Sequence, residues 1–351
     1  MPFHFRNKIK LQIFGQSHSD ELGVVIGGLP PGESVDVEEI KKFLCLRKGG
    51  KSFSTKREEP DMPKIVSGLV RGKTCGSPIA CMFENKDAKG KDYKQFIPRP
   101  SHADYNAFIK YGGFADYLGG GHFSGRMTLP LCFAGAICMQ ILERRGVNIY
   151  AHILSIGGVL DREYNPIEIE THELTEFCVL DLKTRNRMLT EIKKAASEGD
   201  SLGGVIECAI TGMPQGLGEA MFDGVESRLS MAVFGIPAVR GIAFGAGFAA
   251  ANMRGSEHND AFYYDGDKVR VKTNHAGGIL GGITTGENIL FKVGIKPTPS
   301  ISIEQDTVDL SAKVNTKLKI EGRHDPCIVP RAVPCVVAAA AIVMLDFLLQ
   351  G

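Results

Sequence analysis

The chain has 351 residues, of which 43% are hydrophobic and 23% charged, and this composition excludes intrinsic disorder for most of its length. Its 41 basic and 40 acidic residues leave a net charge of +1, so no overall field attracts nucleic acid or an anionic membrane. Any site for a polyanion must therefore be a local concentration of charge. Glycine, at 42 residues, exceeds the usual share of about 7% and indicates many tight backbone positions.

The cysteines and the N-terminal residues indicate in which cellular compartment the protein is expected. Nine cysteines occur without a C-x-x-C pair, mostly among apolar neighbours, which is typical of buried free thiols in a reducing cytosol. Residues 1–6 contain no apolar run, so we expect no signal peptide. These features favour a cytoplasmic protein.

Strands and helices are expected to alternate along the chain, with glycine at several joints. Asp36 has the position of a helix N-cap, and Gly146 and Gly199 each follow an apolar or amphipathic stretch and end it. No repeat and no linker divides the sequence, so we expect one α/β domain over residues 1–351. The expected elements are strands at 11–14 and 23–26, helices at 37–44, 131–145 and 189–198, strands at 205–210, 289–295 and 318–320, and a helix at 332–349.

The stretch 332–349 is the one long apolar segment. It contains Pro334 and Asp346 and is shorter than the roughly 20 uninterrupted apolar residues of a membrane span. We therefore expect a buried core helix.

A basic segment extends over residues 41–57, with seven cations and no anion. Its second half is rich in glycine, serine and threonine. One interpretation is a solvated surface loop. The other is a mobile lid that closes over a small polyanion, since guanidinium and ammonium groups pair with phosphate and carboxylate.

Histidine recurs in three short polar motifs, at residues 15–20, 100–104 and 322–326. Each motif places histidine near small residues and an acid, which makes a general acid/base site plausible because histidine titrates near neutral pH. A fourth group, residues 258–260, could suggest a metal site, but no second cluster of ligands supports it.

Glycine loops provide a third feature. Residues 119–126 (GGGHFSGR) precede the apolar helix, so free backbone N–H groups and Arg126 would lie near a helix start, as in an anion-binding site. The loop is neither a Walker A motif nor a dinucleotide fingerprint. Residues 274–282 and 296–300 could also approach a ligand, or could form tight turns at a subunit interface.

Taken together, these motifs resemble the chorismate synthase family. The match rests on six segments in the order of the family, and they span residues 14–326. They are 14–18 (FGQSH), 99–105 (RPSHADY), 119–126 (GGGHFSGR), 253–260 (MRGSEHND), 274–282 (NHAGGILGG) with 296–298 (KPT), and 322–326 (GRHDP).

The resemblance implies a fold and an activity. The fold would be a single-domain layered β-α-β sandwich with internal pseudo-symmetry, assembled as a homotetramer. The activity would be the anti 1,4-elimination of phosphate from 5-enolpyruvylshikimate 3-phosphate to give chorismate. The cofactor would be reduced FMN, used without net redox change and supplied either with NAD(P)H by the chain itself or by a separate flavin reductase.

The resemblance also assigns residues to roles. His18 would protonate the leaving phosphate, His102 would protonate or stabilise reduced flavin, and Asp325 would assist proton removal through flavin N5. Substrate would be bound by Arg47, Arg99, Arg126, Arg323 and Lys51. Flavin would be bound by His122, Phe123, Ser124, Pro237, Ala238, Gly281, Lys296, Pro297, Thr298, Pro299, Ser300 and Arg323.

Two other classes of function stay open from the sequence. A flavin oxidoreductase would consume stoichiometric NAD(P)H during turnover. A glycine-rich protein that binds phosphate or nucleic acid is the third class, and the balanced charge argues against nucleic acid.

Overall fold

The computed structural model describes residues 3–6, 8–87, 93–165, 169, 173–320 and 324–351. Its first sheet has five antiparallel strands in the order β1-β2-β3-β7-β4. In β3, the side chains of Leu22, Val24 and Ile26 are buried, because alternate positions of a strand face the same side. The strands predicted at 11–14 and 23–26 are confirmed within β2 and β3. The bounds are β1 Phe3–Arg6, β2 Lys10–Gly15, β3 Glu21–Gly27, β4 Lys64–Ser67 and β7 Ile79–Glu84.

The second sheet also has five antiparallel strands, in the order β11-β16-β10-β8-β9. Its central strands are nearly continuous apolar runs, as expected for strands covered on both faces. The strands predicted at 205–210 and 289–295 are confirmed. The bounds are β8 Asn148–Ile156, β9 Val159–Leu160, β10 Gly204–Thr211, β11 Val239–Phe244 and β16 Ile289–Ile295.

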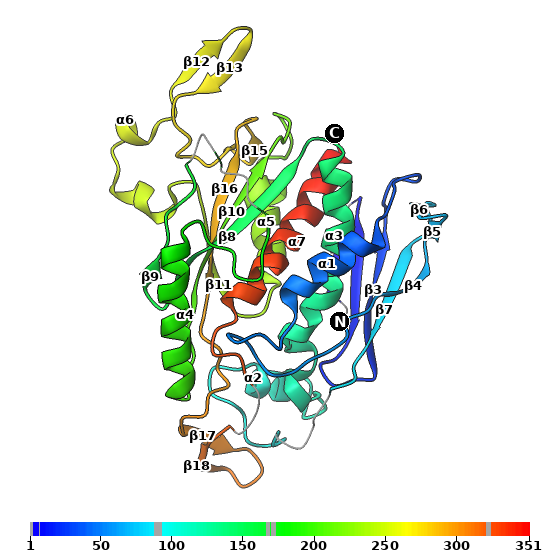
Figure 1. The fold of residues 1–351 in the computed structure, drawn as a ribbon, viewed down its shortest axis with the longest axis vertical. Helices are drawn as coiled ribbons and strands as arrows, with labels where there is room; N and C mark the ends of the chain where they lie inside the picture. Colours follow the sequence, from blue (N-terminus) through cyan, green and yellow to red (C-terminus); the bar gives the residue numbers. More distant parts are fainter. Residues whose placement is uncertain (1–2, 7, 88–92, 166–168, 170–172, 321–323) are drawn as a thin grey trace.

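A layer of helices lies between the two sheets (Figure 1). The first sheet packs on α3 and the second on α7, and α1 and α5 pack beside these two long helices. Each half thus pairs a five-stranded sheet with one apolar helix, which confirms the layered β-α-β sandwich with two matching halves. The bounds are α1 Val37–Arg47, α3 Thr128–Glu143, α5 Val225–Phe234 and α7 Val329–Leu348.

Smaller elements complete the described part of the chain. Helix α4 packs against β8 and β9, and the hairpins β12–β13 and β17–β18 project from opposite ends of the molecule (Figure 1). The bounds are α4 Leu182–Ser197, α2 Asp104–Lys110, α6 Gly255–His258, η1 Leu118–Phe123, η2 Gly125–Met127, η3 Met221–Asp223, η4 Gly247–Asn252, β5 Leu69–Val70, β6 Lys73–Thr74, β12 Phe262–Asp265, β13 Lys268–Val271, β14 Ile279–Leu280, β15 Ile283–Thr284, β17 Gln305–Asp309 and β18 Val314–Leu318.

The expected helices are present. Helix α1 begins at Val37 as predicted, whereas α3, α4 and α7 begin earlier than predicted. The carboxylate of Asp36 accepts hydrogen bonds from the backbone of Glu38 and Glu39, so it caps α1 as predicted. Helix α3 begins three residues before the expected start. Helix α4 begins seven residues earlier than expected, because Asp181 caps it and its first turns carry no apolar periodicity.

The strand predicted at 318–320 is wrong. Leu318 and Ile320 are buried, but β18 ends at Leu318, because its partner β17 pairs only with residues 314–318. Alternating burial here reflects packing without a strand partner.

Two helices are long and apolar enough to cross a membrane by composition, Gly125–Glu143 and Val329–Leu348. They are 83% and 89% buried inside the protein. The core helix predicted at 332–349 is therefore confirmed as α7.

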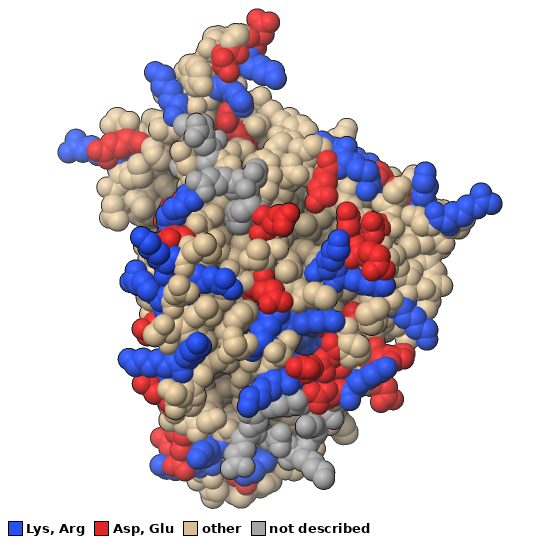
Figure 2. Space-filling view, viewed as in Figure 1, with Lys and Arg blue, Asp and Glu red and all other residues tan. Residues whose placement is uncertain are grey.

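On the face of the molecule in Figure 2, cationic and anionic side chains are interspersed, which agrees with the balanced composition. This face shows no extended patch of one charge.

Candidate active site

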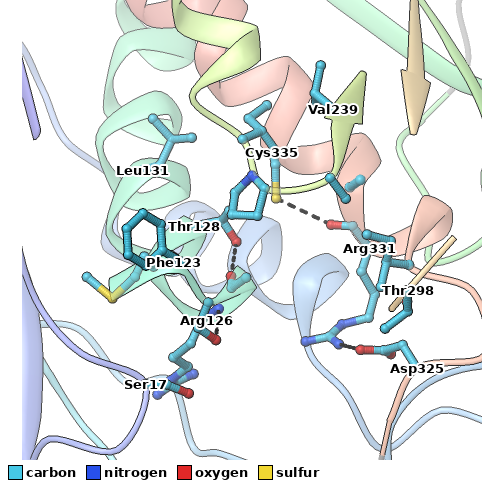
Figure 3. Close-up of a pocket in the computed structure, with 18 of the residues that line it drawn as sticks. Ser17, Phe123, Arg126, Thr128, Leu131, Val239, Thr298, Asp325, Arg331 and Cys335 are labelled. Atoms are coloured by element: carbon cyan, nitrogen blue, oxygen red, sulfur yellow. Dashed lines mark hydrogen bonds and ion pairs between the residues drawn. The ribbon is translucent and has the colours of Figure 1, made fainter. Parts of the chain in front are cut away.

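A cavity of about 770 Å³ opens where the helix layer meets the loops at one end of the two sheets (Figure 3). Its size falls in the range of about 300–1,000 Å³ that is usual for small-molecule sites. Its walls come from segments far apart in the chain, including residues 47–61, 99–128, 231–240 and 324–342. Fourteen predicted site residues line it: Arg47, Arg99, His102, His122, Phe123, Ser124, Arg126, Pro237, Ala238, Lys296, Thr298, Pro299, Ser300 and Asp325.

The cavity is rich in positive charge. Seven cationic side chains and three carboxylates line it among the described residues, an excess of four positive charges if histidine is neutral. This local excess contrasts with the balanced chain as a whole, and it favours an anionic ligand. The cations are Arg47, Arg57, Arg99, Arg126, Arg240, Lys296 and Arg331, and the carboxylates are Glu59, Asp61 and Asp325.

The triple glycine run packs against both predicted catalytic histidines. Gly119 and Gly120 have φ of 61° and 89°, in the left-handed region that side chains disfavour. A Cβ on Gly119 would lie 2.2 Å from Cε1 of His18, and one on Gly120 would lie 2.8 Å from Cε1 of His102. The two imidazoles therefore flank one short loop. His18 lies directly behind Gly119, and its ring packs edge-on against Tyr93, which lines the cavity.

Asp61 joins two of the predicted substrate arginines. One carboxylate oxygen is 3.3 Å from Nη2 of Arg47, and the other pairs with Nη1 of Arg126. All three side chains are buried. Burial alone would raise the pKa of Asp61, but the two guanidiniums outweigh it, and the pKa lies below its ordinary value.

Arg99 and His102 share the carboxylate of Asp104. Arg99 donates from Nε and Nη2 to the two oxygens, at 2.7 and 2.8 Å, and Nδ1 of His102 lies 2.6 Å from Oδ1. Arg99 also donates to Oγ of Ser300 at 3.2 Å, which ties this cluster to the 296–300 segment. Burial lowers the pKa of His102, and its contact with Asp104 only partly offsets this effect. The lowered pKa of His102 favours the neutral imidazole near pH 7.

The basic segment folds back onto the predicted base. Residues 41–47 belong to α1, and Arg47 is 3% exposed, so the interpretation as a solvated loop is wrong for this residue. The backbone N–H of Thr55 donates to Oδ1 of Asp325 at 2.8 Å, and Nη1 of Arg331 lies 2.5 Å from Oδ2. Arg331 also donates to the carbonyl of Arg47 at 2.8 Å. Segment 48–57, the predicted base and the start of α7 thus form one hydrogen-bonded unit.

Several predicted residues do not line the cavity. Lys51 donates to the carbonyls of Cys45 and Leu46 at 3.2 Å, so its ammonium caps the end of α1. Pro297 is exposed, and its ring faces Gly203.

Gly281 does not line the cavity either. It lies in the β14–β15 turn, and its neighbour Gly282 approaches Gly224 at the start of α5, whereas the end of this helix borders the cavity. Arg323 falls outside the described residues.

The structure adds site residues that the motifs did not single out. Arg57 donates to the hydroxyl and carbonyl oxygens of Ser17 and to Glu59, and it lines the cavity with Asp61 and Arg331. Arg57 belonged to the counted basic segment, so charge was its signal. Asp61 and Arg331 stand among ordinary loop and helix residues, and only the fold brings them to the site.

The candidate metal group has a structural role. The carboxylate of Asp260 accepts hydrogen bonds from the hydroxyl of Thr273 and from the backbone of His275 and Ala276. These bonds fasten the start of the 274–282 loop.

Comparison with known proteins gives a consistent result. The family model described as chorismate synthase matches residues 9–349. A chorismate synthase from Pyrococcus abyssi is 47% identical over 343 residues, which cover 97% of this chain and 96% of that protein. Another, from Korarchaeum cryptofilum, is 42% identical over 361 residues, covering 99% and 97%. A crystal structure of chorismate synthase superimposes with a TM-score of 0.76 and 26% identity, covering 100% of this chain and 93% of the other.

Proposed function

Because the chain belongs to the chorismate synthase family of carbon–oxygen lyases, we propose that it converts 5-enolpyruvylshikimate 3-phosphate to chorismate and phosphate. The reaction is an anti 1,4-elimination that requires reduced FMN without net redox change, and it ends the shikimate pathway. The observation that carries this proposal is the convergence of cations and predicted acid/base residues, from segments far apart in the chain, on one cavity.

The cavity suits a substrate with two carboxylates and a phosphate. Three arginines of the cavity are each less than 9% exposed: Arg47, Arg99 and Arg126. An anion that binds them must therefore lose its hydration water. Nε of Arg47 is buried and has no hydrogen-bond partner among the described residues. A buried donor without a partner costs about 1–3 kcal/mol, and an anionic oxygen of the substrate would recover this cost.

The part of the cavity wall next to these arginines suits FMN. Residues 122–124, 237–238 and 296–300 line it, apart from Pro297. Oγ1 of Thr298 is buried there without a hydrogen-bond partner in the described part of the chain, so it is available to a polar ligand. Lys296 adds a cation whose ammonium contacts Ser101. Held by these residues, reduced FMN would supply the electron density that loss of phosphate requires and a nitrogen that assists removal of the C6 proton.

Three residues of the chain each have a separate role in proton transfer: His18, His102 and Asp325. His18, behind Gly119, holds the proton that the leaving phosphate takes. Burial lowers the pKa of His102, and the negative charge of a bound ligand would raise this pKa and favour protonation of the imidazole. Asp325 is oriented by Thr55 and Arg331 to accept the proton removed from substrate carbon.

The remaining family properties are proposed on the same ground. They are one domain over residues 1–351, a homotetramer, a cytoplasmic location and, if the chain does not reduce its own flavin with NAD(P)H, a separate flavin reductase. Exposed apolar side chains at Met231 and Phe234 of α5 and at Phe248 offer surfaces for subunit contacts.

The test is an anaerobic assay of the purified chain with dithionite-reduced FMN and 5-enolpyruvylshikimate 3-phosphate. We expect chorismate absorbance and free phosphate to appear in equal amounts over many turnovers, without consumption of reductant. Stoichiometric consumption of NAD(P)H would instead show a flavin oxidoreductase. No phosphate release with reduced FMN would overturn the proposal.

A further inference from the structure

Two cysteines meet at the wall of the cavity. Cys132 on α3 and Cys335 on α7 have sulfur atoms 3.8 Å apart, and the side chains are 0% and 3% exposed. Cys335 lines the cavity, where its sulfur lies beside the carbonyl of Arg331 (Figure 3). A small molecule in the cavity can therefore reach Cys335, while Cys132 lies behind it.

The backbones of α3 and α7 come close together beside this pair. One turn further along, a Cβ on Gly135 would lie 2.4 Å from Cα of Ala338, so the backbones of α3 and α7 are in contact. Ordinary helix pairs are about 8–10 Å apart, whereas a disulfide joins Cα atoms about 4.4–6.8 Å apart. Rotation about the Cα–Cβ bonds can then bring the sulfurs to the bond length of about 2.05 Å.

The two thiols differ in acidity. The thiol of Cys132 donates a hydrogen bond to the sulfur of Cys335, and this bond, helped by the Arg47 guanidinium against the effect of burial, lowers the pKa of Cys335 to about 7. Burial raises the pKa of Cys132. Cys335 lines the cavity and Cys132 does not, so an oxidant in the cavity meets Cys335 first, and Cys132 behind it is placed to resolve.

We propose that Cys132 and Cys335 form a redox-active dithiol that hydrogen peroxide oxidises to an intramolecular disulfide. The Cys335 thiolate attacks one peroxide oxygen, the O–O bond breaks, and the other oxygen leaves as hydroxide, which takes a proton to become water. This leaves a sulfenic acid on Cys335. Cys132 gives up its proton and attacks the sulfenic sulfur, the S–O bond breaks, and a second water leaves as the S–S bond forms. Two thiols and one peroxide thus give one disulfide and two waters.

The test uses the full chain with its two exposed cysteines replaced, Cys45→Ser and Cys75→Ser, to remove surface oxidation. The protein is treated with hydrogen peroxide, denatured, alkylated and mapped by mass spectrometry. We expect one linked peptide pair that contains Cys132 and Cys335, a loss of two alkylated thiols, and full recovery with dithiothreitol. Cys138 is an internal control, because it lies buried on the same helix and burial raises its pKa.

Two variants assign the order of attack. In Cys132→Ala, the sulfenic acid has no resolving thiol, so dimedone should label Cys335. In Cys335→Val, Cys132 should stay a free thiol under the same treatment. The proposal is overturned if both thiols of the parent protein are recovered unmodified, if Cys138 oxidises as fast, or if dimedone labels Cys132 in Cys335→Val.

Discussion

The backbone N–H of Thr55 donates a hydrogen bond of 2.8 Å to Oδ1 of Asp325, which lies 270 residues further along the chain. Arg331 holds the second oxygen of the same carboxylate and the carbonyl of Arg47. The basic segment therefore contacts the predicted base and a predicted substrate arginine at once. Substrate binding and orientation of the base should be coupled through these bonds.

The first prediction concerns Arg47. Replacing it with alanine removes a buried guanidinium that faces the cavity, and a substrate anion left without this partner loses several kcal/mol. We expect Arg47→Ala to raise KM at least tenfold, with little change in affinity for free FMN. Steady-state kinetics and flavin titration measure the two effects.

Lys48 provides the matched control for this loss of charge. It is the next residue, and its ammonium donates to the carbonyl of Pro60 and does not line the cavity. Lys48→Ala should leave KM within about twofold of wild type. An unchanged KM in Arg47→Ala would show that the basic segment 41–57 does not bind the substrate through this residue.

The second prediction separates the two histidines. General acid/base groups contribute about 10²–10⁴-fold, so His18→Ala and His102→Ala should each keep the fold and lose most of kcat. In His18→Ala, reduced flavin should bind with a nearly normal spectrum. In His102→Ala, the spectrum of reduced FMN bound with substrate should also change, because the proton donor beside the ring is absent.

Anaerobic single-turnover absorbance distinguishes these outcomes. Circular dichroism shows whether each variant is folded. Turnover of His18→Ala at the wild-type rate would remove this residue from the mechanism.

The third prediction concerns the glycine run. Alanine at Gly120 would place a methyl group 2.8 Å from Cε1 of His102, at a φ of 89° that L-residues rarely adopt. We expect Gly120→Ala to displace the imidazole and to lower kcat by at least tenfold in the anaerobic assay. Gly72→Ala is the control, because Gly72 has a similar φ of 74°, no atom lies within 4 Å of the added Cβ, and the residue does not line the cavity. Equal activity in the two variants would show that close packing against His102 is dispensable.

The fourth prediction is a dependence of stability on pH. Because the folded pKa of Asp61 is lowered, its ionised form stabilises the protein above the ordinary carboxyl pKa, and this contribution is lost as the pH falls below about 4. At pH 7, Asp61→Asn leaves two buried guanidiniums without their counter-ion, and loss of a buried partner typically costs about 3–5 kcal/mol. The difference in unfolding free energy from wild type should shrink as the pH approaches 3.

Urea denaturation at a series of pH values measures this difference. Glu38→Gln serves as the control, since Glu38 makes only an exposed ion pair with Lys41 and should matter by less than about 1 kcal/mol. A difference for Asp61→Asn that is the same at every pH would contradict the pairing seen in the structure.

The sequence was sufficient to predict the structural features that depend on residues close together in the chain. The carboxylate of Asp36 caps the helix that follows it, and alternation of Leu11 and Ile13 marks a strand with one buried face, because both signals act over a few residues. Helix α4 shows the limit. Its first residue, Leu182, is 71% exposed, so apolar periodicity could not reveal the start, and the cap at Asp181 was the only local signal.

The candidate site divides in the same way. The predicted site residues include His102, Asp325 and three of the six arginines that line the cavity among the described residues. The motifs could not name Asp61 or Arg331, because Asp61 pairs with Arg126, 65 residues away, and Arg331 donates to the carbonyl of Arg47, 284 residues away. Lys51 illustrates the opposite error. Its charge suggested that it binds a ligand, but in the structure its ammonium donates hydrogen bonds to two carbonyls at the end of α1.

Helix α7 follows every strand of both sheets in the chain, yet it packs in the layer between them. Its Asp346 accepts a hydrogen bond from the backbone of Ile9, at the start of the first sheet, and pairs with Arg228 of α5. During synthesis on the ribosome, the strands therefore emerge before the helix that covers them. Until α7 emerges, the inner faces of the sheets lack part of their cover, and the nascent chain should depend on chaperones that shield apolar surface.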